Sequence, residues 1–271
     1  MSPPDIPESK PLREPNLAAS GGGDLEVKIP VTRILYFLLL VEIVFFGVDC
    51  LIYFNDIIDS RHIRRLLDIT KETNLPTWFS SIQFVVVGLV AAAAALYRSH
   101  EGRGRLALGW LLVALFFVFS GIDDTAMIHE RLGSFAEDLA KDAREKSLFV
   151  QAIDAWPSYY WQIVVLPFFI GFGLFMTVFF WRELKGRDVW VLFAAGLFCY
   201  AGAVALDVLE GTKDYKVLMK ALSMKSKEVR HLMRSVEEVT EMVGTTLILT
   251  AFLENWRRLA GKGGVTFRVV G

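Results

Sequence analysis

The sequence is poor in the residues that most metal and redox sites use, with only two cysteines and four histidines among 271 residues. Cys50 and Cys199 both lie in apolar runs and form no CxxC pair, so the sequence indicates no disulfide framework. We interpret both cysteines as small apolar packing residues. Four histidines, one of them in a basic loop, argue against haem pairs and histidine-rich di-iron boxes.

Several common catalytic motifs are also absent. His129 and Glu130 are followed by Arg131, so there is no HExxH zinc motif, and no paired HxxxH occurs. The chain has no Walker loop, no GxSxG and no dinucleotide fingerprint. Its net charge of −1 and its lack of a basic patch argue against a nucleic-acid partner.

What the sequence has is apolar residues, which make up 54% of the chain and exceed the share typical of soluble domains. They gather in six segments of about 20 residues, the length of helix that crosses a bilayer. We therefore predict an all-α polytopic membrane protein with six transmembrane helices. The predicted spans are 33–54, 77–97, 106–125, 158–181, 189–208 and 239–256. Pro167 should kink the fourth span.

Lysine and arginine in the short loops predict the orientation. Residues 98–105 and 182–187 are strongly basic, and the C-terminal segment carries Arg257, Arg258, Lys262 and Arg268. With six spans these segments lie on the side of the N-terminus, which the positive-inside rule makes cytoplasmic. We expect a multi-pass protein of the inner or plasma membrane with both termini cytoplasmic. The outer connections 55–76, 126–157 and 209–238 are expected to be largely helical.

Three regions follow from this pattern. Residues 1–30 are predicted to be a disordered cytoplasmic tail, 31–258 the six-helix domain, and 259–271 a short cytoplasmic tail. No signal peptide is expected, because the first apolar run begins only near Val31. Residues 216–243 contain neither Gly nor Pro and are compatible with one long helix that enters span six.

Acidic residues gather where three spans meet the predicted outer face. With six spans and a cytoplasmic N-terminus, spans three and five end on the outer face and span six begins there, so we predict that their acidic residues converge. Carboxylates at this depth in a membrane usually carry function. The candidate site residues are Asp123, Asp124, His129, Glu130, Asp207, Glu210, Glu238 and Glu241. Span one adds Glu42 and Asp49 within its apolar run, which together with His231 form an ion path or a second shell.

Helical spacing places several of these groups on shared faces. The pairs three residues apart are Asp207 with Glu210, Glu238 with Glu241, and Glu228 with His231. The Glu-x-x-His spacing is the one used by carboxylate-bridged dimetal bundles. Asp123 and Glu130, seven apart, share a face if their helix continues through Asp124.

So many carboxylates repel one another and need a neutralising partner. Protonation is one answer, and a divalent ion such as Zn, Fe or Mn is another. Arginine is the third, since Arg131, Arg230 and Arg234 are near in sequence. In the metal interpretation Glu130 and Asp124 are catalytic, and the ligands are Asp123, His129, Asp207, Glu210, Glu238 and Glu241.

Three function classes remain open. The first is a metal-dependent membrane enzyme acting on a lipid or another apolar substrate, and the second is an ion- or proton-coupled transporter or channel. The third is a structural or sensory subunit, with a homo-oligomer or a membrane complex as the partner. The acids at the end of the bundle favour the first class, and Glu42 in mid-span favours the second.

Overall fold

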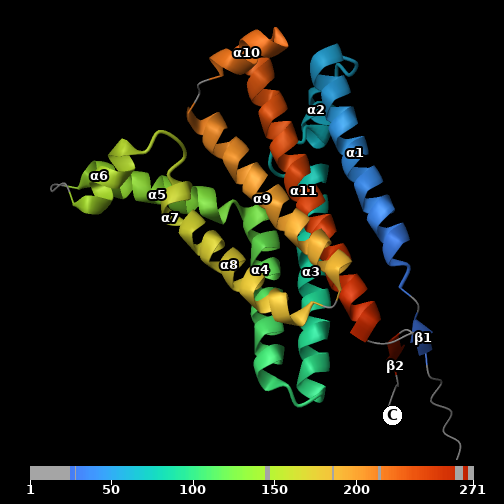
Figure 1. Cartoon of the computed structure of the whole chain (residues 1–271). Helices are drawn as coiled ribbons and strands as arrows, with labels where there is room; N and C mark the ends of the chain where they lie inside the picture. The colour runs from blue at the N-terminus through green and yellow to red at the C-terminus, as the bar shows by residue number, and fades with distance from the viewer. Residues whose placement is uncertain are drawn as a thin grey trace, which may run out of the picture.

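The computed structural model describes residues 25–27, 29–143, 147–184, 186–212, 215–259 and 265–267. The chain folds as a bundle of α-helices (Figure 1), which confirms the predicted all-α polytopic class. Five helices are long and apolar enough to cross a membrane. They are α1 (Val31–Asn55), α3 (Leu75–His100), α4 (Gly104–Ala126), α8 (Leu166–Glu183) and α9 (Arg187–Thr212).

The predicted sixth span lies within α11 (Ser226–Leu259), the longest helix of the described chain. This helix packs against α9, α1 and α3, and Figure 1 shows it running through the bundle between α1 and α9. Its N-terminal half is rich in charge, so α11 is not among the five apolar helices. The count of six spans stays a prediction.

The remaining elements are short. They are α2 (Arg61–Leu67), α5 (Ile128–Asp142), α6 (Leu148–Ala155), α7 (Trp161–Val164), α10 (Lys216–Leu222), β1 (Leu25–Val27) and β2 (Val265–Phe267). The two strands pair antiparallel, with Leu25 opposite Phe267. The pairing joins the two ends of the helical region. Both strands fall in predicted tails, most of which lies outside the described residues.

Two left-handed residues interrupt helices that the sequence pattern predicts as continuous. Met127 has φ 55°, which ends α4, so Asp123 and Glu130 lie on different helices and do not share the helix face that a continuous helix would give them. Ser223 has φ 54°, so the predicted helix over 216–243 is divided into α10 and α11. Non-glycine residues rarely adopt such angles, and apolar periodicity does not report them.

The predicted kink in span four appears as a break beside Pro167. Helix α7 ends at Val164, α8 begins at Leu166, and Pro167 occupies the first turn of α8. Proline is tolerated there because the first-turn N–H groups have no helical partner. The apolar segment 158–181 is therefore two helices instead of one.

Close helix approaches hold the central part of the bundle together. A Cβ on Gly196 of α9 would lie 2.8 Å from the Gly244 backbone oxygen of α11. Small residues of this kind let helix backbones pack tightly in a membrane. Next to this contact lies an aromatic core in which the rings of Trp110, Phe180 and Phe193 pack around Phe252.

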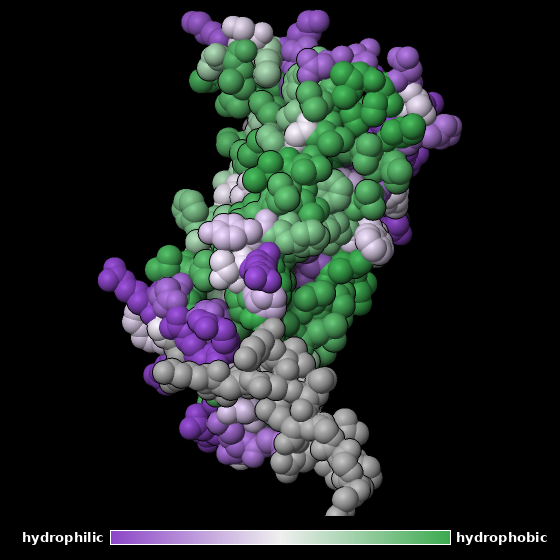
Figure 2. Space-filling model, turned by 90° about the vertical axis from the view of Figure 1, so that its right-hand side faces the viewer, coloured by the Kyte–Doolittle hydropathy of each residue, from purple (hydrophilic) through white to green (hydrophobic). Residues whose placement is uncertain are grey.

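Helix α1 covers one side of this core and turns most of its surface outward. Figure 2 shows a broad apolar band on this side of the molecule, with polar residues toward its two ends. The exposed residues of α1 include Tyr36, Phe37, Leu40, Ile43 and Val44. Its buried residues are Val31, Glu42, Asp49 and Ile52, so two of the four carry a carboxylate.

Candidate functional site

The break between α4 and α5 fixes the imidazole of His129. Asp123, in the last turn of α4, accepts a hydrogen bond on Oδ1 from the His129 backbone N–H at 2.8 Å. Its Oδ2 lies 2.8 Å from the ring Nδ1 of His129. A carboxylate on one ring nitrogen sets the tautomer and orientation of a histidine and leaves Nε2 for another ligand. Asp123, predicted as a metal ligand, thus has both oxygens engaged with His129.

The same carboxylate alters the protonation of His129, which lies in α5 outside the apolar helices. Burial lowers the pKa of His129, but the hydrogen bond and the charge of Asp123 outweigh this effect. The net pKa of His129 therefore lies above its usual value. The edge of the ring packs against Trp161 at 5.0 Å between centroids, which further fixes its orientation.

Asp124 is positioned by α3. The Ser81 hydroxyl donates a hydrogen bond to Oδ2 of Asp124 at 2.7 Å. The two helices come this close because Gly121 lies at their contact, where a Cβ would lie 2.8 Å from the Ser81 backbone oxygen. Asp124 is half-buried beside this contact.

Asp207 of α9 is positioned by α7. The Gln162 side-chain amide donates to Oδ2 of Asp207 at 2.8 Å. The oxygen of the same amide accepts a hydrogen bond from Trp156 Nε1 at 2.9 Å. Because Trp156 can only donate, this bond fixes which end of the Gln162 amide faces Asp207.

Glu241 of α11 is the residue on which these groups converge. It interacts electrostatically with Asp124, His129 and Asp207, and Asp207 also interacts with His129. Three more half-buried glutamates, Glu72, Glu237 and Glu238, interact electrostatically with Glu241 or with the groups around it. We call this set the acidic cluster: Glu72, Asp124, His129, Asp207, Glu237, Glu238 and Glu241.

Glu210, predicted as a ligand beside Asp207, has arginine partners. Arg230 and Arg234 form ion pairs with its Oε1, and the Tyr159 hydroxyl donates to its Oε2. Glu210 is 1% exposed, so its charge needs such partners. Among the three ways to neutralise the acids, arginine is the one present at Glu210.

Glu130, predicted as catalytic, lies at the edge of the acidic cluster. It is exposed on α5, where the break at Met127 separates it from the face of Asp123. It still interacts electrostatically with His129 and Glu72. An exposed carboxylate next to buried ones can exchange protons with water.

Glu42 lies deeper in the bundle, away from the acidic cluster. It is 0% exposed, and its Oε1 accepts hydrogen bonds from Gln83 Nε2 at 2.8 Å and Thr246 Oγ1 at 2.5 Å. Its Oε2 has no hydrogen-bond partner in the described part of the chain. The carboxyl thus joins α1 to α3 and α11 in the middle of an apolar helix.

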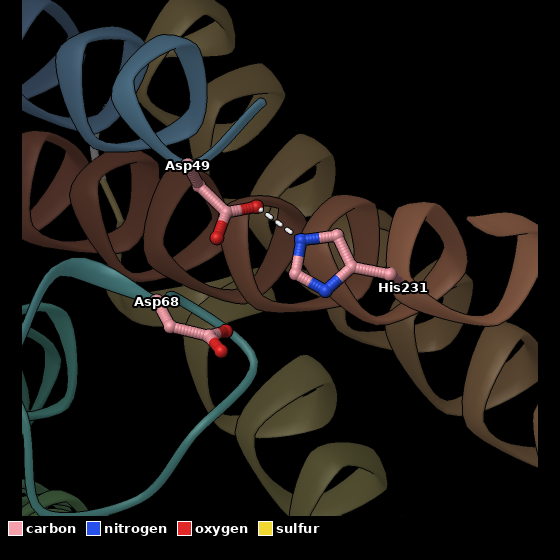
Figure 3. A group of neighbouring side chains, drawn as sticks. All are labelled: Asp49, Asp68 and His231. Carbon is pink, nitrogen blue, oxygen red and sulfur yellow. Dashed lines mark hydrogen bonds and ion pairs between the residues drawn. The ribbon is translucent and has the colours of Figure 1, made fainter. Parts of the chain in front are cut away.

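Asp49 lies on α1 seven residues, or about two helical turns, after Glu42, and it contacts His231 of α11. The Asp49 Oδ2 lies 2.9 Å from His231 Nε2 and accepts from the Ser235 hydroxyl at 2.7 Å. Figure 3 shows Asp68, from the segment after α2, directed toward the same pair. Glu228, of the Glu-x-x-His pair, instead accepts from the Lys225 backbone N–H.

Comparison with known proteins adds a family. Residues 34–255 match the model of a family described as a domain of unknown function, DUF8692. The chain belongs to this family. No curated protein and no solved structure matches. The matched range holds every candidate residue from Glu42 to Glu241, so the acidic cluster and the α1 carboxyls lie within the family's domain.

Sequence reasoning missed several residues of these sites. Asp68 and Glu72 lie in a connection of mixed charge, where no periodicity sets them apart from solvated loop acids. Gln83 and Thr246 are neutral residues within long helices, and their role follows only from contact with Glu42. The one available signal for Gln83 and Thr246 is their polarity in apolar surroundings, which is weaker than that of a charged residue.

Glu72 gives the acidic cluster a titration near neutral pH. Burial, together with the Asp124 and Glu130 carboxylates, raises its pKa from 4.5 to about 7. Between these values the folded protein binds more protons than the unfolded chain, so stability falls as pH rises through this interval. We expect Glu72→Gln to be more stable than the wild type above pH 7 and equal to it at pH 4.5. Thermal unfolding of chelator-treated protein across this range measures the difference.

The control for this experiment is Asp142→Asn, an exposed acid at the end of α5. Its unfolding temperature should follow that of the wild type at every pH. Parallel curves for Glu72→Gln and the wild type would show that Glu72 does not change its proton occupancy on folding.

Proposed function

We propose that the acidic cluster binds a divalent metal ion and that the protein is a metal-dependent membrane enzyme acting on a lipid or another apolar substrate. The observation that supports this is the arrangement around Glu241. Carboxylates from the loop before α3, from α4, from α9 and from α11 interact electrostatically with one another, and two of them, Asp207 and Glu241, also interact with the His129 imidazole. The electrostatic partners of Glu241 include three carboxyl groups and a single histidine.

The positioning contacts suggest which atoms would bind the ion. Ser81 and Gln162 each orient one oxygen of Asp124 or Asp207, and Asp123 presents the Nε2 atom of His129. Second-shell hydrogen bonds of this kind are typical of metal ligands. We therefore propose His129, Asp124, Asp207 and Glu241 as ligands, with Glu238 in support and Asp123 as the residue that orients His129. Glu210 is not among the proposed ligands, because it forms ion pairs with Arg230 and Arg234.

The donor set indicates the metal and the chemistry. Imidazole with carboxylates suits Zn, Fe or Mn. Such an ion lowers the pKa of a bound water and polarises a substrate oxygen. Glu130, exposed and adjacent to His129, is the proposed general base that passes the proton to solvent. The apolar side of the bundle (Figure 2) suits a protein whose substrate would be a membrane lipid.

Metal content of the purified protein tests this proposal. We expect His129→Ala and Glu241→Gln each to lower metal affinity by about 100-fold or more, since even second-shell changes cost 10–100-fold. Asp154→Asn, an exposed acid on α6, is the matched control and should keep the metal. Wild-type metal content in both cluster variants would contradict the assignment.

One observation favours a transporter as the second candidate. Polar side chains continue along α11 below Glu241 to Thr245 and Thr246, and there Thr246 donates to Oε1 of Glu42, whose Oε2 has no hydrogen-bond partner among the described residues. Intramembrane carboxyls of this kind mark ion and proton paths. In a transporter, Glu42 would be the next ion- or proton-binding position after the acidic cluster. In an enzyme, Glu42 would serve only to attach α1 to α3 and α11.

Glu42→Gln separates the two candidates, because glutamine keeps the shape and a hydrogen-bonding capacity but cannot carry a proton. For an enzyme we expect bound metal nearly unchanged and no ion or proton flux in vesicles, with or without the substitution. For a transporter we expect flux in the wild type that is lost in Glu42→Gln while metal still binds. Flux measured in reconstituted vesicles and metal content on the same preparations decide between them.

The same proposal includes an orientation, with both termini cytoplasmic and the acidic cluster on the outer side of an inner or plasma membrane. Its support is the exposed arginines near the β1–β2 end, such as Arg103, Arg105 and Arg182. Arg98 contributes less, because it is buried in an ion pair with Glu183.

Reporter fusions test this orientation. We expect fusions after His100 and after Gly261 to report the cytoplasm, and one near Asp142 to report the outside, because the positive-inside rule acts on short loops. A cytoplasmic signal near Asp142 would reverse the orientation and place the acidic cluster on the inner face.

A further inference from the structure

A second group of metal-ligating side chains lies outside the acidic cluster. Asp49 on α1, Asp68 after α2 and His231 on α11 each offer a ligand atom, and these atoms all lie within 4.8 Å of one another. No other set in the described part of the chain brings three such groups this close. Figure 3 shows the Asp49 and Asp68 carboxylates facing the imidazole from two different segments. We call these three residues the Asp–Asp–His group.

Surrounding contacts hold each of the three side chains in place. The backbone N–H of Ile69 donates to Asp49 Oδ1 at 3.1 Å, and Ser235 donates to its Oδ2. Thr70 binds Asp68 Oδ1 through both its backbone N–H and its hydroxyl, at 3.0 and 2.7 Å. The His231 ring stacks on Tyr53 at 3.5 Å between centroids. Such outer contacts orient ligands in known metal sites.

Two of the three residues are buried, and a cavity lies beside them. Asp49 is 2% exposed and His231 8%. A cavity of about 530 Å³ is lined by Tyr53, Phe54 and residues 225–228. Both aromatic residues of this lining also contact the His231 ring. The cavity at the start of α11 is therefore separated from the His231 ring only by these two aromatic side chains.

We propose that the Asp–Asp–His group is a zinc site of its own, which joins α1, the segment after α2 and α11. Zinc takes imidazole nitrogen and carboxylate oxygen at about 2.0–2.2 Å, and a tetrahedral ion holds its ligands about 3.4 Å apart. The present separations, at most 4.8 Å, would have to shorten to that value when the ion binds. The imidazole disfavours magnesium and calcium, which select oxygen ligands.

The proposal does not depend on the metal in the acidic cluster. Along α11, His231 and Glu238 are seven residues apart, about 10 Å at 1.5 Å per residue. The strongest electrostatic partners of Glu238 and Glu241 all belong to the acidic cluster. Each site can therefore be removed while the other is measured.

Zinc titration of full-length, chelator-treated protein in detergent tests the inference. The starting protein is Glu241→Gln, which removes the proposed ligand at the centre of the acidic cluster. We expect one equivalent of zinc to bind and to raise the unfolding temperature, because zinc binds only the folded arrangement. Adding Asp68→Asn should weaken zinc binding by about 100-fold or more and abolish the temperature shift.

Two further variants keep the result unambiguous. The Asp68 side chain is half-buried and accepts hydrogen bonds from Thr70, which an amide can also accept, so its amide variant should fold. His231→Gln alters a buried contact and serves as the second variant. Asp59→Asn, exposed just before α2, is the control and should retain zinc. The inference is overturned if Glu241→Gln protein binds no zinc, or if Asp68→Asn binds it as well as the control does. Either result leaves a group held by hydrogen bonds alone.

Discussion

The structure depends on satisfying two carboxyl groups that an apolar helix carries into the bundle. Unpaired polar groups cost several kcal/mol in hydrocarbon, so Glu42 and Asp49 must find partners inside the protein. Glu42 is hydrogen-bonded to Gln83 and Thr246, and Asp49 to His231 and Ser235. Helix α1 buries little else, since most of its apolar surface faces outward. Its rotation and its height against α11 are thus set by polar contacts, because lipid provides no hydrophobic force between helices.

Helix α11 supplies nearly all these partners, and this role explains its composition. A helix surrounded by α1, α3 and α9 is shielded from lipid and can carry glutamates, threonines and a histidine where an outer helix could not. Its polar positions run from His231 past Glu241 to Thr246, a span of about 22 Å at 1.5 Å per residue. The acidic cluster, the Asp–Asp–His group and the Glu42 contact are therefore three levels of one helix. Any change in its register would alter all three together.

The sequence allowed the fold class and the general location of the acids to be predicted, because apolar length and charge position are local properties. The gathering of Asp124, His129, Asp207 and Glu241 follows from the parity of the spans alone. Finer features depend on tertiary structure. The break at Met127 needs a left-handed residue that carries no local signal, and it moves Glu130 away from Asp123. Glu210 could be assigned to arginines only after α9 and α11 were seen together, and Asp68 only after the segment following α2 was placed.

The distance along the chain between Glu42 and its partner has a consequence for biosynthesis. Thr246 follows Glu42 by 204 residues, and His231 follows Asp49 by 182. Ribosomes add about 5–20 residues per second, so the first helix waits about 10–40 s for the last one. During that interval its acids lack their α11 partners, so contact with water or with the insertion machinery would have to satisfy them. The bundle is therefore completed from its two ends at once, when the final helix enters and the first one docks against it.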